Sequence, residues 1–335
     1  MADQFSESDI RPTNFESGQK QALEQDIEWL LERKDNFVRV SCPACGSDRS
    51  QTLFHKYGLT YRECDNCETL YISPRPTEKI LEEFYKNSKN YAFWAKYIYP
   101  QSEKIRKTKI VTPRVQRIST LVEEYGISKN KIVEVGAGFG TFGQVIVESG
   151  EFNNYYAVEP TPELARECEA KGLNVIMEPI EKAHLEVTNA DVVVSFEVIE
   201  HLFNPKDFII KCTSLMGPNS LLILTCPNWK GFETQVLMEG SDTFDAEHLN
   251  YFSPSSMKLC LESLGLEVLK LFTPGEIDLD IVKSKIEKGF EVKEDKFIQY
   301  LTSRTDKETL NNFQRFLQKN NLSTHMWVAA KKIDL

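Results

Sequence analysis

The sequence lacks any long hydrophobic run, and it has no excess of basic residues. No apolar stretch reaches the roughly 18 residues of a membrane-spanning helix, so we expect no membrane span. The 50 acidic residues outnumber the 40 basic ones, giving a net charge of -10. Nucleic-acid-binding proteins usually carry a basic surface, so we expect no nucleic-acid partner. The first residues, MADQFSESDIRPTNFESG, lack the basic start and apolar stretch of a secretion signal, which predicts a cytoplasmic protein.

The cysteines therefore need an explanation other than disulfide bonds, which are rare in a reducing compartment. Four of the eight form two C-x-x-C units, one in SCPACG and one in RECDNCE. Such tight turns let two thiolates face one ion, and two turns complete a tetrahedron. The spacing predicts a structural zinc in a zinc ribbon, with a disulfide pair as the alternative. The expected ligands are Cys42, Cys45, Cys64 and Cys67.

The 335 residues, of which 41% are hydrophobic, can form one large domain and a smaller one. We expect an N-terminal helix in 1–38, the zinc ribbon in 39–75 and a helical connector in 76–125. From 126 to 335 near-continuous apolar strands alternate with helices, which predicts an α/β fold with a parallel sheet covered on both faces. A polar helical insertion at about 276–322 precedes the last strand and offers a surface for oligomerisation.

The segment KIVEVGAGFGTFGQ contains two competing glycine patterns. One is the dinucleotide pattern G-x-G-x-x-G from Gly138 to Gly143, and the other is E-x-G-x-G-x-G from Glu134 to Gly140. If the strand ends at Val135, dinucleotide binding would want a third glycine where the chain has Thr141.

Acidic residues favour the second pattern. Glu134 lies at the strand end, where a carboxylate would repel a pyrophosphate but suit an ammonium group. Glu159 ends the next strand, in AVEP, where an acid can accept hydrogen bonds from ribose hydroxyls. A ligand with a ribose, a positive end and no pyrophosphate fits S-adenosylmethionine better than NAD.

The segments VEVGAGFG, AVEP, PIEK and FEVIEHLFNP, in this order, resemble those of class I S-adenosylmethionine-dependent methyltransferases. The resemblance implies a Rossmann-like seven-stranded sheet whose last strand is antiparallel. It also implies that the glycines lie under the methionine and ribose, that Glu134 serves the amino group, and that Glu159 serves the ribose. Ile180 and Glu181 would then contact adenine, and Phe196 and Glu197 the methionine part. The full implied cofactor set is Glu134, Gly136, Ala137, Gly138, Gly140, Glu159, Pro160, Ile180, Glu181, Phe196 and Glu197.

A narrower resemblance concerns the acceptor. A four-cysteine ribbon followed by SPRPTEKILEEFY, the methyltransferase core and EHLNYFSP is similar to a bacterial group that includes deoxysugar C-methyltransferases. Members of that group carry a further C-terminal domain, and this chain ends soon after its core. We expect a small polar acceptor, namely a sugar or nucleotide-linked sugar of surface polysaccharide or secondary-metabolite biosynthesis. A protein or lipid-linked acceptor and a non-catalytic S-adenosylmethionine-binding module stay open as alternatives.

Candidate bases are few because the chain has only five histidines. A positioned base contributes ~10²–10⁴ in rate to a transfer that needs a proton removed. His248 precedes a helix in DAEHLNYFS and is the expected main base, with the adjacent Glu247 expected to orient or charge it. His201 follows the fourth strand of the core in EVIEH and is expected to support it. Both match histidines that lie in the active site of the deoxysugar group, and Tyr85 and Tyr91 are weaker pocket candidates.

Overall fold

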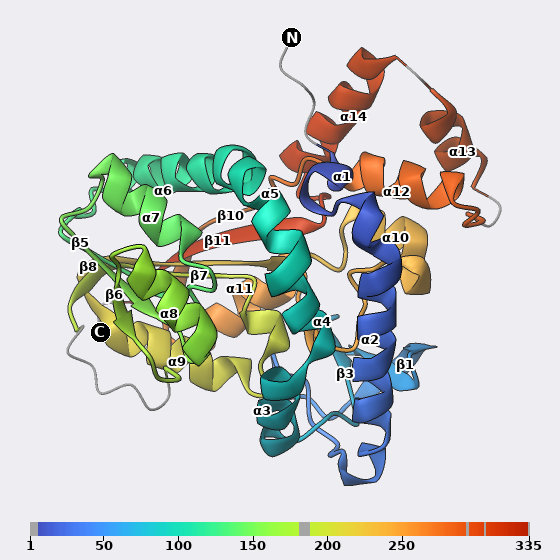
Figure 1. The fold of residues 1–335 in the computed structure, drawn as a ribbon, viewed down its shortest axis with the longest axis horizontal. Coiled ribbons are helices and arrows are strands. Elements are labelled where there is room, and N and C mark those ends of the chain that lie inside the picture. Colours follow the sequence, from blue (N-terminus) through green and yellow to red (C-terminus); the bar gives the residue numbers. More distant parts are fainter. Residues whose placement is uncertain (1–5, 181–187, 293–294, 305, 334–335) are drawn as a thin grey trace.

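The computed structural model describes residues 6–180, 188–292, 295–304 and 306–333 (Figure 1). Its centre is a seven-stranded sheet with the strand order β10-β11-β8-β7-β4-β5-β6. The five strands from β4 to β8 run parallel, and β11 is antiparallel to both of its neighbours. This is the α/β sheet that the sequence pattern predicts, with the antiparallel last strand that the family resemblance implies. The strands are β4 Lys131–Val135, β5 Asn154–Val158, β6 Asn174–Ile176, β7 Ala190–Phe196, β8 Met216–Pro227, β10 Leu266–Phe272 and β11 His325–Lys332.

Helices cover both faces of this sheet because successive strand residues point to opposite sides. Ile132 packs with helices α6, α7 and α8, whereas its neighbour Val133 packs with α9 and α11 on the other face. Near-continuous apolar strands are therefore required here, since both faces are buried. The helices are α6 Thr112–Glu124, α7 Thr141–Ser149, α8 Pro162–Ala170, α9 Pro205–Leu215 and α11 Pro254–Glu262.

A second, four-stranded sheet lies at the bottom of the molecule in Figure 1. Its order is β1-β2-β3-β9, with all neighbours antiparallel. Three strands come from the segment that carries the paired cysteines: β1 Ser50–Lys56, β2 Leu59–Cys64 and β3 Leu70–Ile72. The fourth, β9 Asn250–Tyr251, comes from the far part of the chain. The small sheet is thus completed by residues directly after His248.

A long helix, α2 Glu16–Leu31, stands beside the small sheet, and α1 Glu7–Ile10 precedes it. Three helices then connect the small sheet to α6 (Figure 1). They are α3 Glu78–Asn87, α4 Lys89–Phe93 and α5 Tyr99–Arg106. Two π-helical turns, Trp94–Ile98 and Lys107–Val111, interrupt this course. Such turns are often found at functional sites. Tyr99, directly after the first of them, stacks on Phe139 of the glycine-rich turn with ring centroids 3.6 Å apart.

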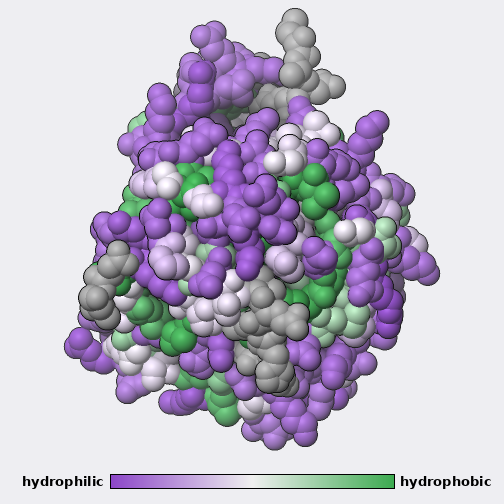
Figure 2. All heavy atoms as spheres, turned by 90° about the vertical axis from the view of Figure 1, so that its left-hand side faces the viewer, coloured by the Kyte–Doolittle hydropathy of each residue, from purple (hydrophilic) through white to green (hydrophobic). Residues whose placement is uncertain are grey.

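Four further helices complete the described residues: α10 Phe232–Leu237 after β8, and α12 Asp278–Glu287, α13 Lys296–Ser303 and α14 Lys307–Lys319 between β10 and β11. The last two extend away from the body at the upper right of Figure 1. On the face shown in Figure 2 the surface is mostly hydrophilic, with separate hydrophobic patches. Within the described residues no helix is long and apolar enough to cross a membrane.

Candidate active site

The glycine-rich turn lies between β4 and α7, at the carboxyl end of the parallel strands. Gly136, Gly138 and Gly140 all have positive φ, at 80°, 55° and 69°. A Cβ on Gly136 would lie 2.6 Å from Cγ2 of Val198, whereas a Cβ on Gly138 would face open space. Gly143 is different, because it lies inside α7 and a Cβ there would collide with the Tyr155 ring. Gly143 therefore serves the close packing of α7 against Tyr155 of β5, while Gly136, Gly138 and Gly140 shape the turn itself.

Glu159 closes the turn from the neighbouring strand. Its Oε2 accepts a hydrogen bond of 2.8 Å from the N–H of Gly138, and its Oε1 accepts one of 2.9 Å from the N–H of Thr161. The carboxylate is buried, and burial raises its pKa against the effect of these two bonds. It therefore stands directly beside the open space at Gly138, where the sequence places the ribose.

Glu134 is buried inside β4 and accepts a hydrogen bond from the hydroxyl of Tyr155. Burial raises the pKa of Glu134 to about 8, while Tyr155 and the charge of Arg114 act in the opposite direction and Glu159 adds to the rise. Burial thus favours the protonated form of this carboxyl group near neutral pH.

Arg114 on α6 was not identified from the sequence as a site residue. Its guanidinium carbon lies 4.1 Å from the centroid of the Phe196 ring. Burial lowers its pKa, and the charges of Glu197 and Glu134 oppose this effect. A partly buried cation therefore faces Phe196 at the end of β7, where the methionine part of the ligand is expected. From the sequence, the basic run KIRKTKIVTPRVQR suggests a solvated helix face, with a phosphate-contacting role as the alternative.

The other residues expected near the cofactor differ in their contacts and in their exposure to solvent. Phe196 packs edge-on against Phe142 with ring centroids 4.9 Å apart. Glu197 has an unusual φ of 54°, and its Oε1 accepts a hydrogen bond of 2.5 Å from Thr225 and lies 3.4 Å from Nδ1 of His325. Ala137 and Ile180 are buried, Pro160 is exposed, and Glu181 lies outside the described residues.

The two candidate histidines come together from different loops. Their ring centroids are 4.5 Å apart. Nδ1 of His248 lies 3.0 Å from the carbonyl oxygen of Thr243 and 3.3 Å from Oδ2 of Asp245. The carboxylate nearest this ring is therefore that of Asp245. Glu247 instead accepts a hydrogen bond of 2.7 Å from the amide of Asn90, and its burial raises its pKa to about 8.

Several buried polar atoms around this pair have no hydrogen-bond partner. They are the Tyr85 hydroxyl, Oδ1 of Asn90, both carboxylate oxygens of Glu200 and Nδ1 of His201. The Tyr85 ring lies 6.2 Å from the His201 ring. Unpaired buried polar groups are costly and uncommon, so this group marks the place where a polar ligand would be held. Tyr91 stands edge-on to Tyr85 with centroids 5.5 Å apart and is partly exposed.

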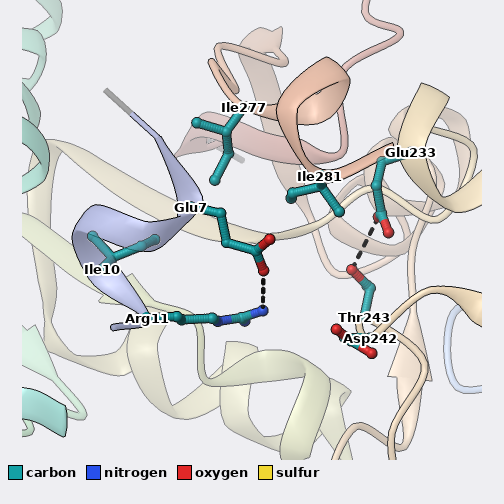
Figure 3. Close-up of a pocket in the computed structure, with 8 residues that line it drawn as sticks. All are labelled: Glu7, Ile10, Arg11, Glu233, Asp242, Thr243, Ile277 and Ile281. Carbon is teal, nitrogen blue, oxygen red and sulfur yellow. Dashed lines mark hydrogen bonds and ion pairs between the residues drawn. The ribbon is translucent and has the colours of Figure 1, made fainter. Parts of the chain in front are cut away.

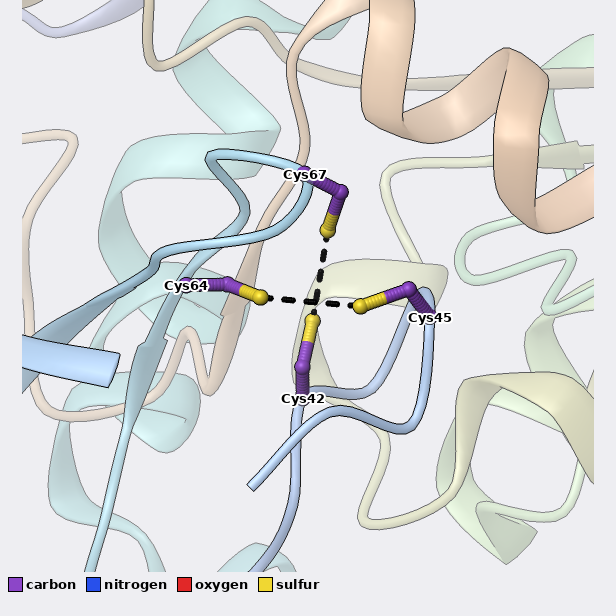
Figure 4. Close-up of side chains that lie close together, drawn as sticks. All are labelled: Cys42, Cys45, Cys64 and Cys67. Atoms are coloured by element: carbon purple, nitrogen blue, oxygen red, sulfur yellow. Dashed lines mark hydrogen bonds between the residues drawn. The ribbon is translucent and has the colours of Figure 1, made fainter. Parts of the chain in front are cut away.

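The four cysteines of the paired C-x-x-C units converge on one point (Figure 4). The Sγ atoms of Cys42 and Cys67 are 3.5 Å apart, as are those of Cys45 and Cys64, and all four lie within 4.8 Å of one another. Zinc bound at ~2.3 Å in a tetrahedron needs sulfur atoms about 3.8 Å apart. The four thiols therefore fit a zinc ion with only a small adjustment.

The cysteine cluster is packed directly onto the main domain. Cys42, Cys64 and Cys67 belong to the same buried apolar cluster as Phe208 and Ile209 of α9. Strand β3 pairs with β9 through Leu70–Tyr251 and Tyr71–Asn250. The buried guanidinium of Arg75 donates to Oδ1 of Asn250, whose amide reaches the carbonyl oxygens of Ile199, Glu200 and Leu202. The small sheet thus fixes both histidine-bearing loops.

Two hollows of the described surface have no histidine among their lining residues. One, of about 80 Å³, is enclosed by α1, α12 and the loop at Asp242 and Thr243 (Figure 3). Its charged lining residues Glu7 and Arg11 bond to each other, and Thr243 bonds to Glu233. The other, of about 230 Å³, lies between the first cysteine turn and the start of α9. Neither is lined by Glu134, Glu159 or a histidine, so the polar chemistry described above lies elsewhere.

The fold and the glycine-acid turn define a class I S-adenosylmethionine-dependent methyltransferase domain. The model of a family described as "Methyltransferase domain" matches residues 103–271, about half of the chain. The chain belongs to this family.

Individual relatives are distant. A protein named "Probable S-adenosylmethionine-dependent methyltransferase" from Mycolicibacterium smegmatis is 31% identical over 81 residues. The match covers 24% of this chain and 30% of that relative, so the chain spans less than a third of the curated relative's length.

Two solved structures illustrate the likeness of fold. An S-adenosylmethionine-dependent methyltransferase from Clostridium acetobutylicum is 12% identical, with 73% of this chain and 99% of that chain covered and a TM-score of 0.47. The plantazolicin methyltransferase BpumL in complex with SAH is 14% identical, with 72% and 93% covered and a TM-score of 0.46. Likeness at this level says nothing about the acceptor.

Proposed function

We propose that this chain is an S-adenosylmethionine-dependent methyltransferase that acts on a small polar acceptor, most simply a sugar or nucleotide-linked sugar. The observation that carries the proposal is the group of buried, unpartnered polar atoms on Tyr85, Asn90, Glu200 and His201. These atoms offer both donors and acceptors, which suits a ligand with several hydroxyl groups. An apolar acceptor would leave them unpaired at a cost of roughly 1–3 kcal/mol each.

The donor would occupy the turn between β4 and α7. Glu159 is in position to accept from the ribose hydroxyls and Glu134 to face the ammonium group. Arg114, the partly buried cation beside Phe196, is suited to the carboxylate of the methionine part. Val198 contacts Gly136 and lies three residues before His201. The methyl group and the histidine pair would therefore be close neighbours.

The chemistry is an in-line displacement at the sulfonium methyl. The acceptor atom forms a bond to the methyl carbon, the carbon–sulfur bond breaks, and sulfur keeps the electron pair. The proton of the acceptor must leave, and His248 is the proposed main base, with His201 supporting and Glu247 near by. The protein contributes alignment and water exclusion besides the base. A carbon acceptor in a keto sugar would depend most on the base.

The cysteine cluster would hold a structural zinc, because four thiolates leave no open position. Together, residues 39–75 would form a zinc ribbon, and 276–322 a helical insertion before the last strand. In this arrangement the ribbon acts on catalysis only through β9 and the loop before it.

A methyl-transfer assay tests the function. The chain would be incubated with S-adenosylmethionine carrying a labelled methyl group and a panel of nucleotide-linked sugars, with protein and glycolipid acceptors alongside. We expect label to enter a sugar in the wild type and not in the His248→Ala variant. Transfer to protein or glycolipid alone would reject the sugar assignment, and binding without any transfer would favour a non-catalytic module.

A further inference from the structure

Glu200, His201 and His248 form a second cluster of metal-ligating side chains, separate from the cysteines. One ligand atom from each lies within 4.8 Å of the others. Glu200 and His201 end a short turn, Ile199–His201, directly after β7, and His248 comes from the loop before β9. The hydrogen bond from Leu249 N–H to the carbonyl oxygen of Glu200, 2.8 Å long, fixes the two loops to each other.

Both imidazoles have one nitrogen occupied and one free. His248 uses Nδ1 toward the carbonyl oxygen of Thr243, so its Nε2 carries the lone pair. His201 is bonded to the backbone of Glu247, yet its Nδ1 has no partner, so the bond uses Nε2. Metal-ligating histidines almost always have their second nitrogen held in this way by a carbonyl or carboxylate. The two free nitrogens belong to facing rings.

Glu200 supplies an independent observation. Its side chain is 1% exposed, and neither carboxylate oxygen has a hydrogen-bond partner. A buried carboxylate without a partner is expensive, and proteins avoid one unless it is paired or binds a metal. The described residues bring no lysine or arginine to it as an ion pair. The missing positive charge must come from outside the chain or be replaced by a proton.

We propose that Glu200, His201 and His248 bind a divalent first-row transition-metal ion in the acceptor pocket. Two imidazoles and one carboxylate leave open positions on such an ion, which an acceptor oxygen can occupy. An oxygen bound to a divalent cation loses its proton more readily. This role rests on the proposed function, and it replaces that of His248 as base, because a nitrogen that ligates an ion cannot accept a proton.

Manganese(II) is a convenient probe, because it is paramagnetic and the four thiolates select zinc. The full chain would receive one equivalent of zinc, which the cysteine site takes first and which leaves the second site free. Mn²⁺ binding would then be followed by the loss of the electron-spin-resonance signal of the free ion. We expect one Mn²⁺ per chain. The Glu200→Gln variant, of nearly the same shape, should bind at least about tenfold more weakly, the range seen even for partners of ligands. Glu163→Gln, an exposed carboxylate on α8, is the matched control.

Folding and function are monitored separately. Zinc content and binding of S-adenosylhomocysteine should be unchanged in Glu200→Gln, which excludes general unfolding, and His201→Ala provides a second ligand variant. Absence of Mn²⁺ binding in the wild type would overturn the proposed cation site, and so would equal binding by the wild type and Glu200→Gln. In either case Glu200 would be protonated or would bind a substrate hydroxyl. If methyl transfer is observed but no cation binds, the proposed function stands and the cation site is rejected. If a cation binds but no acceptor is methylated, only the proposed function is rejected.

Discussion

The rings of His201 and His248 lie edge to face with centroids 4.5 Å apart, although each comes from a different loop. Their proximity depends on the bond between Leu249 and Glu200 and on the amide of Asn250, which reaches three carbonyl oxygens of the turn after β7. The proposed acceptor site is therefore built from two loops that hydrogen bonds to the backbone hold together. Substitution of each histidine tests the role of its loop.

His248→Ala should lower turnover by ~10² or more, the range for a lost general base, because it removes either the base or a ligand of the ion proposed in its place. Affinity for S-adenosylmethionine should not change. His55→Ala, at an exposed position on β1, is the control. The measurement is steady-state kinetics with calorimetric binding of the donor. Wild-type turnover in His248→Ala together with a loss in His201→Ala would reverse the ranking of the two histidines. If both keep wild-type turnover, transfer relies on alignment alone.

Glu159→Gln should weaken both S-adenosylmethionine and its demethylated product. Hydrogen bonds to a charged group contribute about 1.5–3 kcal/mol, which corresponds to roughly 10- to 150-fold in affinity. Glu163→Gln, on the exposed start of α8, is a control of equal charge change. Calorimetry with both ligands is the measurement. Equal affinities in wild type and Glu159→Gln would reject the ribose assignment.

Arg114→Met should show which end of the donor Arg114 contacts. The variant keeps an apolar side chain over Phe196 but loses the cation, so S-adenosylhomocysteine should bind about 10- to 100-fold more weakly. 5′-Methylthioadenosine has no amino-acid part and should bind as before. Arg117→Met, one turn along α6 and over Trp327 instead, is the control. A parallel loss for both ligands would show that Arg114 supports the fold and not the carboxylate.

Donor binding should release a proton near neutral pH. Burial raises the pKa of Glu134 to about 8, so the free protein holds this carboxyl largely protonated at pH 7. An ammonium group beside it favours the charged form and lowers the pKa, and affinity should therefore rise with pH and level off above about 8. Tyr155, Arg114 and Glu159 are the other groups that face it.

Calorimetry at pH 7 in two buffers with different ionisation enthalpies measures this proton release. In Glu134→Gln the dependence on buffer should disappear, because the titrating group has gone. Unchanged release in that variant would assign the proton to another group.

Metal analysis should find one zinc per chain at the cysteine site. Cys42→Ser should lose it and destabilise the N-terminal part, because much of the folding free energy of small zinc modules comes from the metal. Cys260→Ala, at a buried cysteine outside the cluster, should keep its zinc. Less than half an equivalent of zinc in carefully purified wild-type protein would contradict the assignment.

Local patterns predicted the parallel α/β sheet well, because its apolar strands and amphipathic helices have periodicities that a single sequence displays. The number of strands and the antiparallel last strand came from the family resemblance. The glycine turn was also predictable, since Gly136, Gly138 and Gly140 sit between a strand and a helix. β9 was not, because a two-residue strand has no periodicity and exists only through its pairing with β3. Asp245 was missed for the same reason, as only the folded loop brings it to His248.

Arg114 shows a further limit. It lies in a basic segment whose other charges suggest a solvated helix face, yet its guanidinium lies over Phe196, which is far away in the sequence. A helical pattern can tell which residues share a face but not which partner that face will meet. Charged residues with such distant partners are therefore easily overlooked.

The pairing of β3 with β9 sets a limit on how far the chain can be shortened. Residues 103–271 match the family, yet a chain beginning after residue 75 would leave the edge of β9 without its neighbour and Asn250 without Arg75. The donor turn between β4 and α7 involves neither contact. Such a shortened chain should still bind the donor, but the loop bearing His248 would lose the strand that supports it. The smallest active fragment should therefore extend beyond the family domain and include the cysteine-bearing strands.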